Sequence, residues 1–314
     1  MPQAGSIPVT VIGGYLGAGK TTLVNRLLRQ ADGLRLAVLV NEFGELPIDA
    51  DLIESREENV IDIAGGCVCC SYGSDLIAAL RDLQALAPAP DHLLVEASGV
   101  ALPEAIAQSV TLLARYRIDG IVVLADAETV RMHGADRYLA GTIAAQLRAA
   151  DIVLLNKTDL PSPDALAETR AWLAERCVDA RIVETESAAI DLSVLLGARP
   201  GRVGAGAGRA HPPHSEHSAV VLTVDGPVDP EKLAERLADS TRDLIRTKGF
   251  VEGLDGRIYG VQTVGRRRTV SVAAAPPAEV GKVVCIRYGA TVEPAALADI
   301  VPACAAQRTV GDQP

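Results

Sequence analysis

Glycines and a lysine near the N-terminus form the clearest chemical motif of the chain. The segment Gly14–Thr21, GYLGAGKT, fits the pattern G-x-x-x-x-G-K-S/T between an expected strand and an expected helix. In such a loop, successive backbone N–H groups and the positive end of the helix dipole converge on one phosphate. Lys20 would reach the β- and γ-phosphates, and Thr21 would ligate Mg²⁺. A glycine-rich turn before an ordinary helix is the alternative interpretation. The residues expected to contact nucleotide here are Gly14, Gly17, Ala18, Gly19, Lys20, Thr21 and Thr22.

A carboxylate, Glu96, ends the apolar segment HLLVE, and Gly99 follows three residues later. In a P-loop protein an acid at such a strand end holds Mg²⁺ or its water, and a glycine N–H can sense the γ-phosphate. We therefore expect Lys20, Thr21 and Glu96 to carry the catalytic roles, with Glu96 orienting metal or water. The sequence offers no unambiguous general base. A strand-end carboxylate that faces solvent is the alternative.

The tetrapeptide Asn156–Asp159, NKTD, follows another apolar segment. Asp159 can accept hydrogen bonds from N1–H and the exocyclic amine of guanine, whereas adenine has no such pair of donors. Asn156 would tie this loop to the base and to the phosphate loop, and the stem of Lys157 could pack on the ring. The motif predicts selectivity for GTP. An Asn-capped turn is the alternative.

Three thiols lie within four residues at Cys67, Cys69 and Cys70, in the segment GGCVCC. Vicinal cysteines form disulfides poorly, and soft thiolates suit Zn²⁺, Cu(I) or another thiophilic ion. Three sulfurs leave one coordination position open, which suits an ion that is passed on. We expect Zn²⁺, with Co²⁺ second. Small buried thiols that act as hydrophobes, or a redox pair, are the alternatives.

Two further segments carry candidate ligands. Asn41–Glu45, NEFGE, precedes two aspartates and would order around the γ-phosphate and Mg²⁺. We assign Glu45 to the transferred metal, and a solvated acidic loop is the alternative. The histidines at 211, 214 and 217 either bind metal or are unstructured polar residues. We expect His92, His133 and Cys177, which stand alone in the sequence, to serve packing or to lie at the surface.

Composition excludes several classes of function. The 314 residues carry 30 Lys+Arg against 40 Asp+Glu, a net charge of −10, with 48% hydrophobic and 3% aromatic residues. This balance is typical of a soluble globular protein and argues against the basic face that nucleic acids and anionic membranes require. No secretion signal and no apolar run of membrane-spanning length is visible, so we expect a cytoplasmic protein with no membrane or nucleic-acid partner.

Apolar strands alternate with helical segments over the first two-thirds, which predicts an α/β domain with a mostly parallel sheet. We expect strands at Val9–Ile12, Leu36–Val40, His92–Glu96, Gly120–Ala125 and Ile152–Asn156. We expect helices at Thr21–Gln30, Asp75–Leu86, Asp136–Ala149 and Asp164–Glu175.

A smaller α+β domain should follow a linker rich in Gly, Ala and Pro. We expect its strands near Ala219–Val224, Leu244–Val251, Ile258–Val264, Thr269–Ala273 and Val283–Tyr288. Helices are expected at Asp229–Ala238 and around Pro294–Ile300. The expected organisation is a P-loop domain over 1–198, a flexible linker over 199–217, the second domain over 218–305 and a tail over 306–314.

Taken in order, these motifs resemble those of CobW-type P-loop GTPases, relatives of the HypB and UreG nickel-insertion GTPases. The matching segments are Gly13–Thr22, Asn41–Glu45, Gly65–Cys70, Val95–Gly99 and Asn156–Asp159, and Leu244–Phe250 resembles the start of the family's C-terminal domain. The resemblance implies a P-loop NTPase fold and metal-linked GTP hydrolysis, as in metallochaperones or insertases for Zn²⁺ or Co²⁺. The sequence also departs from the family pattern, because it lacks a long His-rich tract and has Val40 where some relatives carry an acid.

The function that we expect is hydrolysis of GTP with Mg²⁺, coupled to delivery of a thiolate-bound Zn²⁺ or Co²⁺ to a client metalloprotein. The chain could also act as a homodimer. A metal sensor or buffer whose affinity GTP gates, without significant turnover, is the alternative. A small-molecule P-loop kinase is disfavoured by the guanine-reading tetrapeptide.

Overall fold

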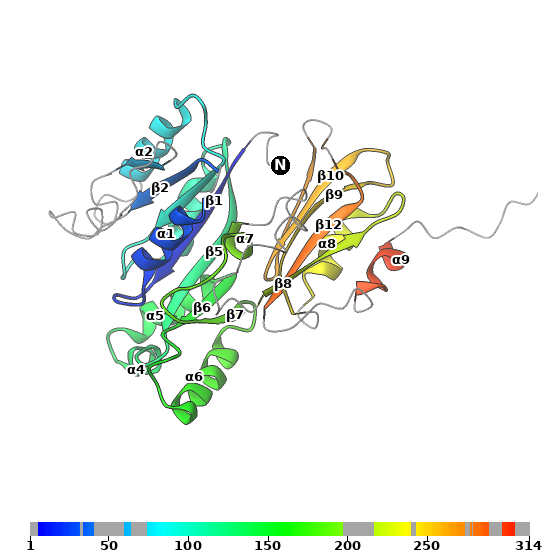
Figure 1. Cartoon of the computed structure of the whole chain (residues 1–314). Coiled ribbons are helices and arrows are strands. Elements are labelled where there is room, and N and C mark those ends of the chain that lie inside the picture. The colour runs from blue at the N-terminus through cyan, green and yellow to red at the C-terminus, as the bar shows by residue number, and fades with distance from the viewer. Residues whose placement is uncertain are drawn as a thin grey trace, which may run out of the picture. The chain divides into compact units, whose positions relative to one another are not determined.

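The chain forms two compact units (Figure 1). The computed structural model describes residues 6–31, 34–40, 60–63, 74–196, 217–239, 243–273, 277, 279–288 and 297–304, with only the backbone described at 60–63, 74–75, 217 and 288. The first unit extends through Leu196, and the second includes the described residues from 217 onward. The domain boundaries expected from the sequence remain predictions.

The first unit is built on a parallel sheet whose described strands lie in the order β3-β2-β4-β1-β5-β6-β7. Its strands are β1 (Ile7–Gly14), β2 (Leu36–Val40), β3 (Val60–Ile63), β4 (His92–Glu96), β5 (Tyr116–Asp126), β6 (Ile152–Asn156) and β7 (Arg181–Thr185). Side chains along β2, β4 and β6 are buried throughout, as expected of parallel strands covered on both faces. The predicted mostly parallel sheet is therefore confirmed.

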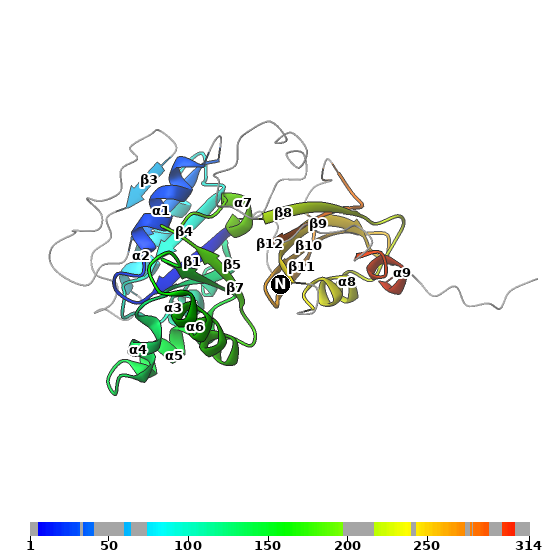
Figure 2. The ribbon, with the colours of Figure 1, turned by 60° about the horizontal axis from the view of Figure 1, so that its bottom comes forward.

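Helices lie on both faces of this sheet. They are α1 (Lys20–Arg29), α2 (Ser74–Gln84), α3 (Pro103–Thr111), α4 (Val130–Ala135), α5 (Ala140–Ala149), α6 (Pro163–Arg176) and α7 (Leu192–Leu196). Figure 2 shows α1 and α7 on one side of the sheet and α3, α5 and α6 on the other. A continuous apolar core joins α2, α3, α5 and α6 to alternate residues of the strands, such as Val9, Val11 and Leu93.

The strand register brings the chemical motifs to one edge of the sheet. The paired positions at that edge are Ile12 with Glu96, Gly14 with Leu124, and Asp126 with Asn156. Because all these strands run parallel, their carboxyl ends meet at the same edge, which is where open α/β sheets bind ligands. The fold thus places the phosphate loop, the strand-end glutamate and the NKTD segment next to one another.

The second unit contains an antiparallel sheet with strands in the order β11-β10-β9-β12-β8. Its elements are β8 (His217–Thr223), α8 (Pro230–Leu237), β9 (Leu244–Glu252), β10 (Ile258–Val264), β11 (Arg267–Val272), β12 (Lys282–Tyr288) and α9 (Ile300–Cys304). Helix α8 begins where the carboxylate of Asp229 accepts hydrogen bonds from the N–H groups of Glu231 and Lys232. Leu233 and Leu237 of α8 pack with Val261 and Val283 in a separate core. The expected smaller α+β unit is confirmed.

Two expected helices differ from those observed. The helix expected at Asp136–Ala149 begins later, at Ala140, because Asp136 Oδ1 accepts hydrogen bonds from the N–H groups of Tyr138 and Leu139 at 2.8 and 3.1 Å. That side chain forms a local turn between α4 and α5. Of the helix expected around Pro294–Ile300, residues 294–296 lie outside the described residues, and α9 begins at Ile300.

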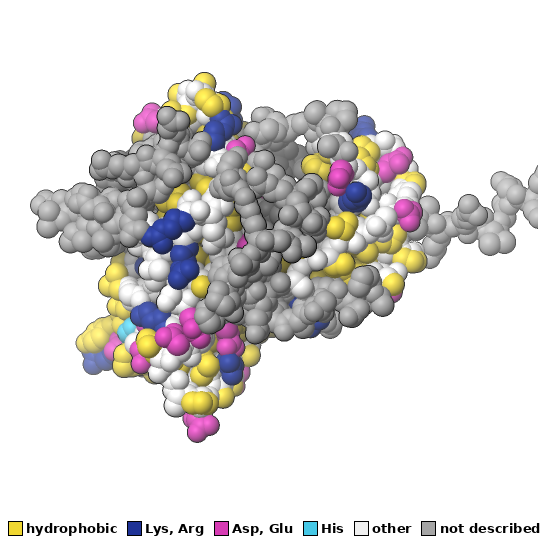
Figure 3. All heavy atoms as spheres, viewed as in Figure 1, with side chains coloured by type: hydrophobic (Ala, Val, Ile, Leu, Met, Phe, Trp, Pro, Cys, Tyr) yellow, Lys and Arg dark blue, Asp and Glu magenta, His cyan; other side chains and the backbone are white. Residues whose placement is uncertain are grey.

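Charged side chains are interspersed on the surface. On the face shown in Figure 3, Lys and Arg side chains of the described residues alternate with Asp, Glu and apolar ones. Within the described part of the chain, no helix is both long enough and apolar enough to cross a membrane.

Candidate functional site

The phosphate loop connects β1 to α1 through glycines that no other residue could replace without strain. Gly14, Gly17 and Gly19 have φ values of 129°, 75° and 103°, which L-residues rarely adopt. A Cβ on Gly14 would lie 2.4 Å from the Leu124 carbonyl oxygen, and one on Gly19 would lie 2.6 Å from Nδ2 of Asn156. The space beside Gly17 is open. Two of the three glycines are therefore required by packing as well as by backbone conformation.

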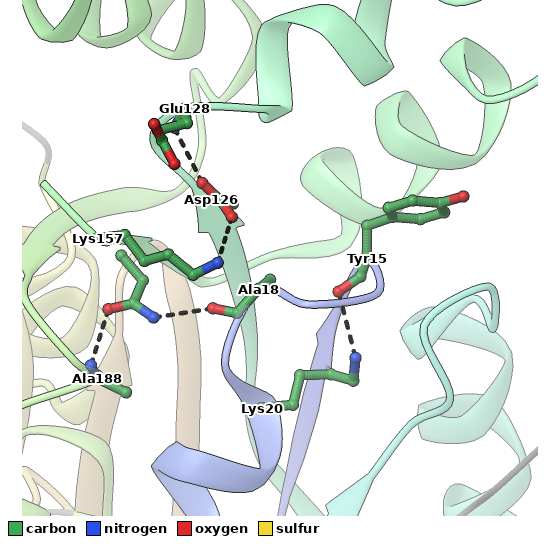
Figure 4. A network of polar contacts seen from close by, with 8 residues as sticks. Tyr15, Ala18, Lys20, Asp126, Glu128, Lys157 and Ala188 are labelled. Carbon is green, nitrogen blue, oxygen red and sulfur yellow. Dashed lines mark hydrogen bonds and ion pairs between the residues drawn. The ribbon is translucent and has the colours of Figure 1, made fainter. Parts of the chain in front are cut away.

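Lys20 is the first residue of α1, and its side chain folds back along the phosphate loop. The residue is only 8% exposed, and Nζ donates a 3.3 Å hydrogen bond to the carbonyl oxygen of Tyr15 (Figure 4). This position puts the ammonium beside the backbone that would hold a phosphate. The charge of Lys20 is thus placed where the motif requires it.

Thr21, the next residue of α1, contacts the strand-end acid. Its Oγ1 donates a 2.9 Å hydrogen bond to Oε1 of Glu96, whose residue is 2% exposed. Hydroxyl and carboxylate oxygens are the ligands that Mg²⁺ prefers, and P-loop proteins use this pair of positions for it. The donor set at this point therefore fits Mg²⁺.

The loop after β4 is held against the phosphate loop. A Cβ on Gly99 would lie 2.5 Å from Cδ2 of Leu16 and 2.8 Å from its backbone nitrogen. From the other side, Nε2 of Gln146 on α5 donates to the carbonyl oxygens of Gly99 and Ala101 at 3.0 and 2.9 Å. Gln146 is 2% exposed. No sequence pattern singles out this glutamine, because an isolated amide within a helix belongs to no motif.

Asn156, at the end of β6, joins the NKTD segment to the phosphate loop. Its Nδ2 donates a 2.9 Å hydrogen bond to the carbonyl oxygen of Ala18, and its Oδ1 accepts one of 2.8 Å from the N–H of Ala188 (Figure 4). Asn156 is 2% exposed. One buried side chain therefore connects the phosphate motif, the NKTD segment and the loop after β7.

Lys157 pairs with an acid that the sequence interpretation missed. Its Nζ lies 2.6 Å from Oδ2 of Asp126 at the end of β5, and Oδ1 of Asp126 accepts from the N–H of Glu128 at 2.9 Å (Figure 4). Lys157 also has a positive φ of 64°. The detectable signal was a carboxylate at the end of an apolar strand, the same signal that identified Glu96. Asp159 is exposed two residues further along.

The loop after β7 is a second feature that sequence reasoning missed. Ser187 and Ala188 have positive φ values of 51° and 54°, which are uncommon for residues other than glycine. This loop reaches the NKTD segment, since the N–H of Thr158 donates to the carbonyl oxygen of Thr185 at 3.4 Å. A polar T-E-S sequence after an apolar strand was the available signal.

Among the remaining expected nucleotide contacts, Ala18 is buried and Thr22 is exposed. The expected metal ligands Cys67, Cys69, Cys70 and Glu45 lie outside the described residues, as do the segment 41–51 and the histidines at 211 and 214. Only the backbone of His217 is described, in β8 rather than in a linker. In the described part of the chain, no three His, Cys, Asp or Glu side chains gather as a metal site would require.

The described cysteines are buried thiols. Burial raises the pKa of Cys177 to about 11 and that of Cys285 to about 12, so both thiols stay protonated at neutral pH. Of the histidines, His92 contacts the hydroxyl of Thr10 at 2.9 Å, and the ring of His133 lies 4.7 Å from that of Tyr15. His92 is buried and His133 is half-buried, and these neighbours fit a packing role for both.

Comparison with known families accounts for this geometry. Residues 8–184, more than half of the chain, match the CobW/HypB/UreG nucleotide-binding domain. The chain belongs to the CobW/HypB/UreG family. Residues 217–305 match the C-terminal domain of the cobalamin synthesis protein CobW. Membership confirms the resemblance found in the sequence and the expected class, a P-loop GTPase.

The chain is similar to several curated proteins of this family. It is 30% identical to a zinc chaperone CobW from Sinorhizobium sp, with 84% of this chain and 86% of that protein covered. It is 33% identical to a zinc chaperone CobW from Pseudomonas aeruginosa, with 85% and 83% covered. A solved structure, the Zn(II)-bound YjiA GTPase from Escherichia coli, matches with a TM-score of 0.42 and 23% identity, covering 94% of this chain and 99% of that one.

Proposed function

We propose that this CobW/HypB/UreG family member hydrolyses GTP and couples hydrolysis to delivery of Zn²⁺ to a client metalloprotein. The observation that best supports the nucleotide part is the double contact of Asn156 with Ala18 and Ala188. It makes the phosphate loop and the guanine-reading motif parts of one site. The cargo part rests on the cysteine motif and on the printed names of the relatives, which are zinc chaperones.

The nucleotide site would work through backbone dipoles and fixed charges. Backbone N–H groups of the phosphate loop and the N-terminus of α1 hold the phosphates, and Lys20 neutralises the oxygens of the β- and γ-phosphates. Thr21 and Glu96 would hold Mg²⁺, which neutralises phosphate charge when it is bound. Asp159 accepts from the base edge, and this interaction selects guanine.

The loop at Gly99 is the part of the described site best suited to sense the γ-phosphate. Its backbone is trapped between Leu16 of the phosphate loop and the amide of Gln146. A bound γ-phosphate would accept hydrogen bonds from the N–H groups of this loop. Loss of that phosphate on hydrolysis would change the loop's contacts, as in other nucleotide switches.

The proposed cargo site consists of Cys67, Cys69 and Cys70, with Glu45 as a further ligand. Soft thiolates suit Zn²⁺, and Co²⁺ is the second candidate. Along the chain, these cysteines lie between the segment 41–51 and the segment after Glu96, which are the two segments expected to respond to the γ-phosphate. Nucleotide state can therefore alter the geometry of the thiolates, which is the proposed means of release.

Phosphate release in steady state tests the enzymatic part. Wild-type protein with Mg²⁺ should hydrolyse GTP and not ATP, and Lys20→Ala should abolish turnover with circular dichroism unchanged. Lys232→Ala, on α8 of the second unit, is the matched control and should keep full turnover. Negligible turnover in the presence of Zn²⁺ and client would favour a GTP-gated sensor or buffer instead. Affinity purification of the GTP-locked protein, with metal analysis of what co-elutes, identifies the client and the ion.

A further inference from the structure

Gln30 connects the end of α1 to the loop after β7 with both ends of its side-chain amide. Its Nε2 donates a 3.0 Å hydrogen bond to the carbonyl oxygen of Ile190. Its Oε1 accepts a 2.7 Å hydrogen bond from the N–H of Leu192. The side chain is half-buried and forms the C-cap position of the helix that begins at the phosphate loop. A glutamine that satisfies two backbone groups 160 residues away in sequence fixes that loop in position.

The loop that Gln30 holds is under backbone strain. Ser187 and Ala188 both adopt the left-handed conformation, with φ values of 51° and 54°. Such a conformation costs free energy in residues other than glycine and persists only where the surroundings hold it. Further contacts within the loop are the bond from Oγ1 of Thr185 to the carbonyl oxygen of Ala189, at 3.0 Å, and that from the Ala189 N–H to the Glu186 carbonyl oxygen, at 2.9 Å. The strained residues thus lie between β7 and the part that Gln30 holds.

The strained residues face the proposed guanine site. The N–H of Ala188 donates to Oδ1 of Asn156, the first residue of NKTD, at 2.8 Å. The other end of that side chain donates to Ala18 in the phosphate loop. The contacts therefore form a closed chain. Helix α1 leads from the phosphate loop to Gln30, Gln30 binds the loop after β7, and Ala188 of that loop binds Asn156, which binds the phosphate loop.

We propose that Gln30 is a positioning residue for guanine recognition. It holds the loop at 186–192 in its strained conformation, so that Ala188 keeps Asn156, and with it the NKTD segment, in register with the phosphate loop. This inference rests on the proposed reading of guanine by Asn156–Asp159. Gln30 acts through the loop and is not itself assigned a contact with nucleotide.

Removing the two hydrogen bonds of Gln30 should weaken recognition of the guanine base and leave binding of the phosphates unchanged. In Gln30→Met both hydrogen bonds disappear while length and helix propensity are retained. The loop can then relax its positive φ values, and Asn156 loses a fixed partner. Lys20 and Thr21 stay in place, because the start of α1 is unchanged. Affinity for GTP should fall about tenfold while that for ATP stays the same, so the GTP-to-ATP ratio falls by the same factor.

Displacement of a fluorescent GDP analogue from the full-length protein measures this ratio. GTP and ATP are titrated as competitors with wild type, Gln30→Met, Gln30→Glu and Gln30→Lys. The glutamate keeps an acceptor for the Leu192 N–H, and the lysine keeps a donor for the Ile190 carbonyl. Each should retain more discrimination than methionine. Gln108→Met, at an exposed position of α3, is the matched control and should match wild type.

The outcomes separate the two proposals. A wild type without preference for GTP overturns both the guanine reading and the role of Gln30. A wild type that prefers GTP, with an equal preference in Gln30→Met, overturns only the role of Gln30. An equal loss of GTP and ATP affinity indicates general damage and also overturns it. Should Gln30→Met fail to fold, the glutamate and lysine variants, which each lose one of the two hydrogen bonds, should show a smaller fall in the GTP-to-ATP ratio, and an unchanged ratio in both overturns the role of Gln30.

Discussion

The hydroxyl of Thr21 lies 2.9 Å from a carboxylate oxygen of Glu96 and donates a hydrogen bond to it. The two residues come from different elements, since Thr21 is in the first turn of α1 and Glu96 is the last residue of β4. Register pairing of β1 with β4 brings them together, because Ile12, just before the phosphate loop, is the partner of Glu96. The fold thereby assembles a Mg²⁺-type donor pair from segments 75 residues apart.

The glycines of the phosphate loop should differ in their tolerance of a methyl group. Gly19→Ala should abolish GDP binding, because its Cβ would displace the amide of Asn156 and force a left-handed alanine. Gly17→Ala meets open space, so only the backbone cost of about 1–2 kcal/mol should appear, with measurable GDP binding retained. Calorimetric GDP titration together with thermal unfolding separates binding from stability. Equal GDP affinity in the two variants would contradict the packing argument.

Guanine selectivity should depend on the exposed carboxylate of Asp159. Asp159→Asn replaces an acceptor by a donor beside N1–H and the amine of guanine, and GTP binding should weaken by about 1–3 kcal/mol. Affinity for ATP should not fall. Calorimetry with both nucleotides measures the change, and Asp164→Asn, at an exposed position of α6, is the charge-matched control. Wild-type protein that binds ATP and GTP equally would show that NKTD does not read the base.

Loss of the hydrogen bonds from Gln146 to the loop after β4 should lower the rate of hydrolysis more than the nucleotide affinity. Gln146→Leu removes the hydrogen bonds to Gly99 and Ala101 but keeps a buried side chain of similar volume. The loop then loses its fixed position, so turnover should fall about tenfold while GDP affinity changes little. Single-turnover hydrolysis and GDP titration give the two values. A variant with wild-type turnover would assign Gln146 a packing role only.

Sequence patterns predicted much of the sheet, because strands buried on both faces read as continuous apolar runs. They missed β3, α3, α4, β7 and α7, which are short or mixed in sequence. They also started the helix α5 too early, at Asp136, where a side-chain turn delays the helix to Ala140. The sequence allowed Lys20, Thr21, Glu96 and Asn156 to be named as candidate site residues, because motifs fix their spacing.

The supporting residues could not be predicted in the same way. Gln30 and Gln146 act on backbone groups that are distant in sequence, and no local pattern distinguishes them from surface glutamines. The pairing of Lys157 with Asp126 depends on two strands being neighbours in the sheet. The left-handed conformations of Ser187 and Ala188 could not be predicted, because neither residue is a glycine.

Alkaline pH should destabilise the second unit through a buried thiol. Burial raises the pKa of Cys285 to about 12 from an ordinary 9.0, so above pH 9.0 the unfolded chain releases this proton first. Stability is fully present below that pH and falls as pH rises, by at most about 1.4 kcal/mol per pH unit. In urea unfolding of the full chain, the difference in free energy of unfolding between wild type and Cys285→Ala should shrink between about pH 8 and about pH 11. A constant difference across this range would contradict the assignment.

The central claim is that nucleotide state controls a thiolate-bound metal, and a zinc competition titration against a chromophoric chelator tests it most directly. The full-length protein is titrated without nucleotide, with GDP and with a non-hydrolysable GTP analogue, alongside a variant in which Cys67, Cys69 and Cys70 are all serine. We predict one Zn²⁺ bound through the three cysteines, with an affinity that differs between the GDP and GTP-analogue states. By linkage, Zn²⁺ must then change the affinity for the GTP analogue, relative to that for GDP, by the same factor. Equal zinc affinity in all three states, or undiminished binding by the triple variant, would contradict the claim.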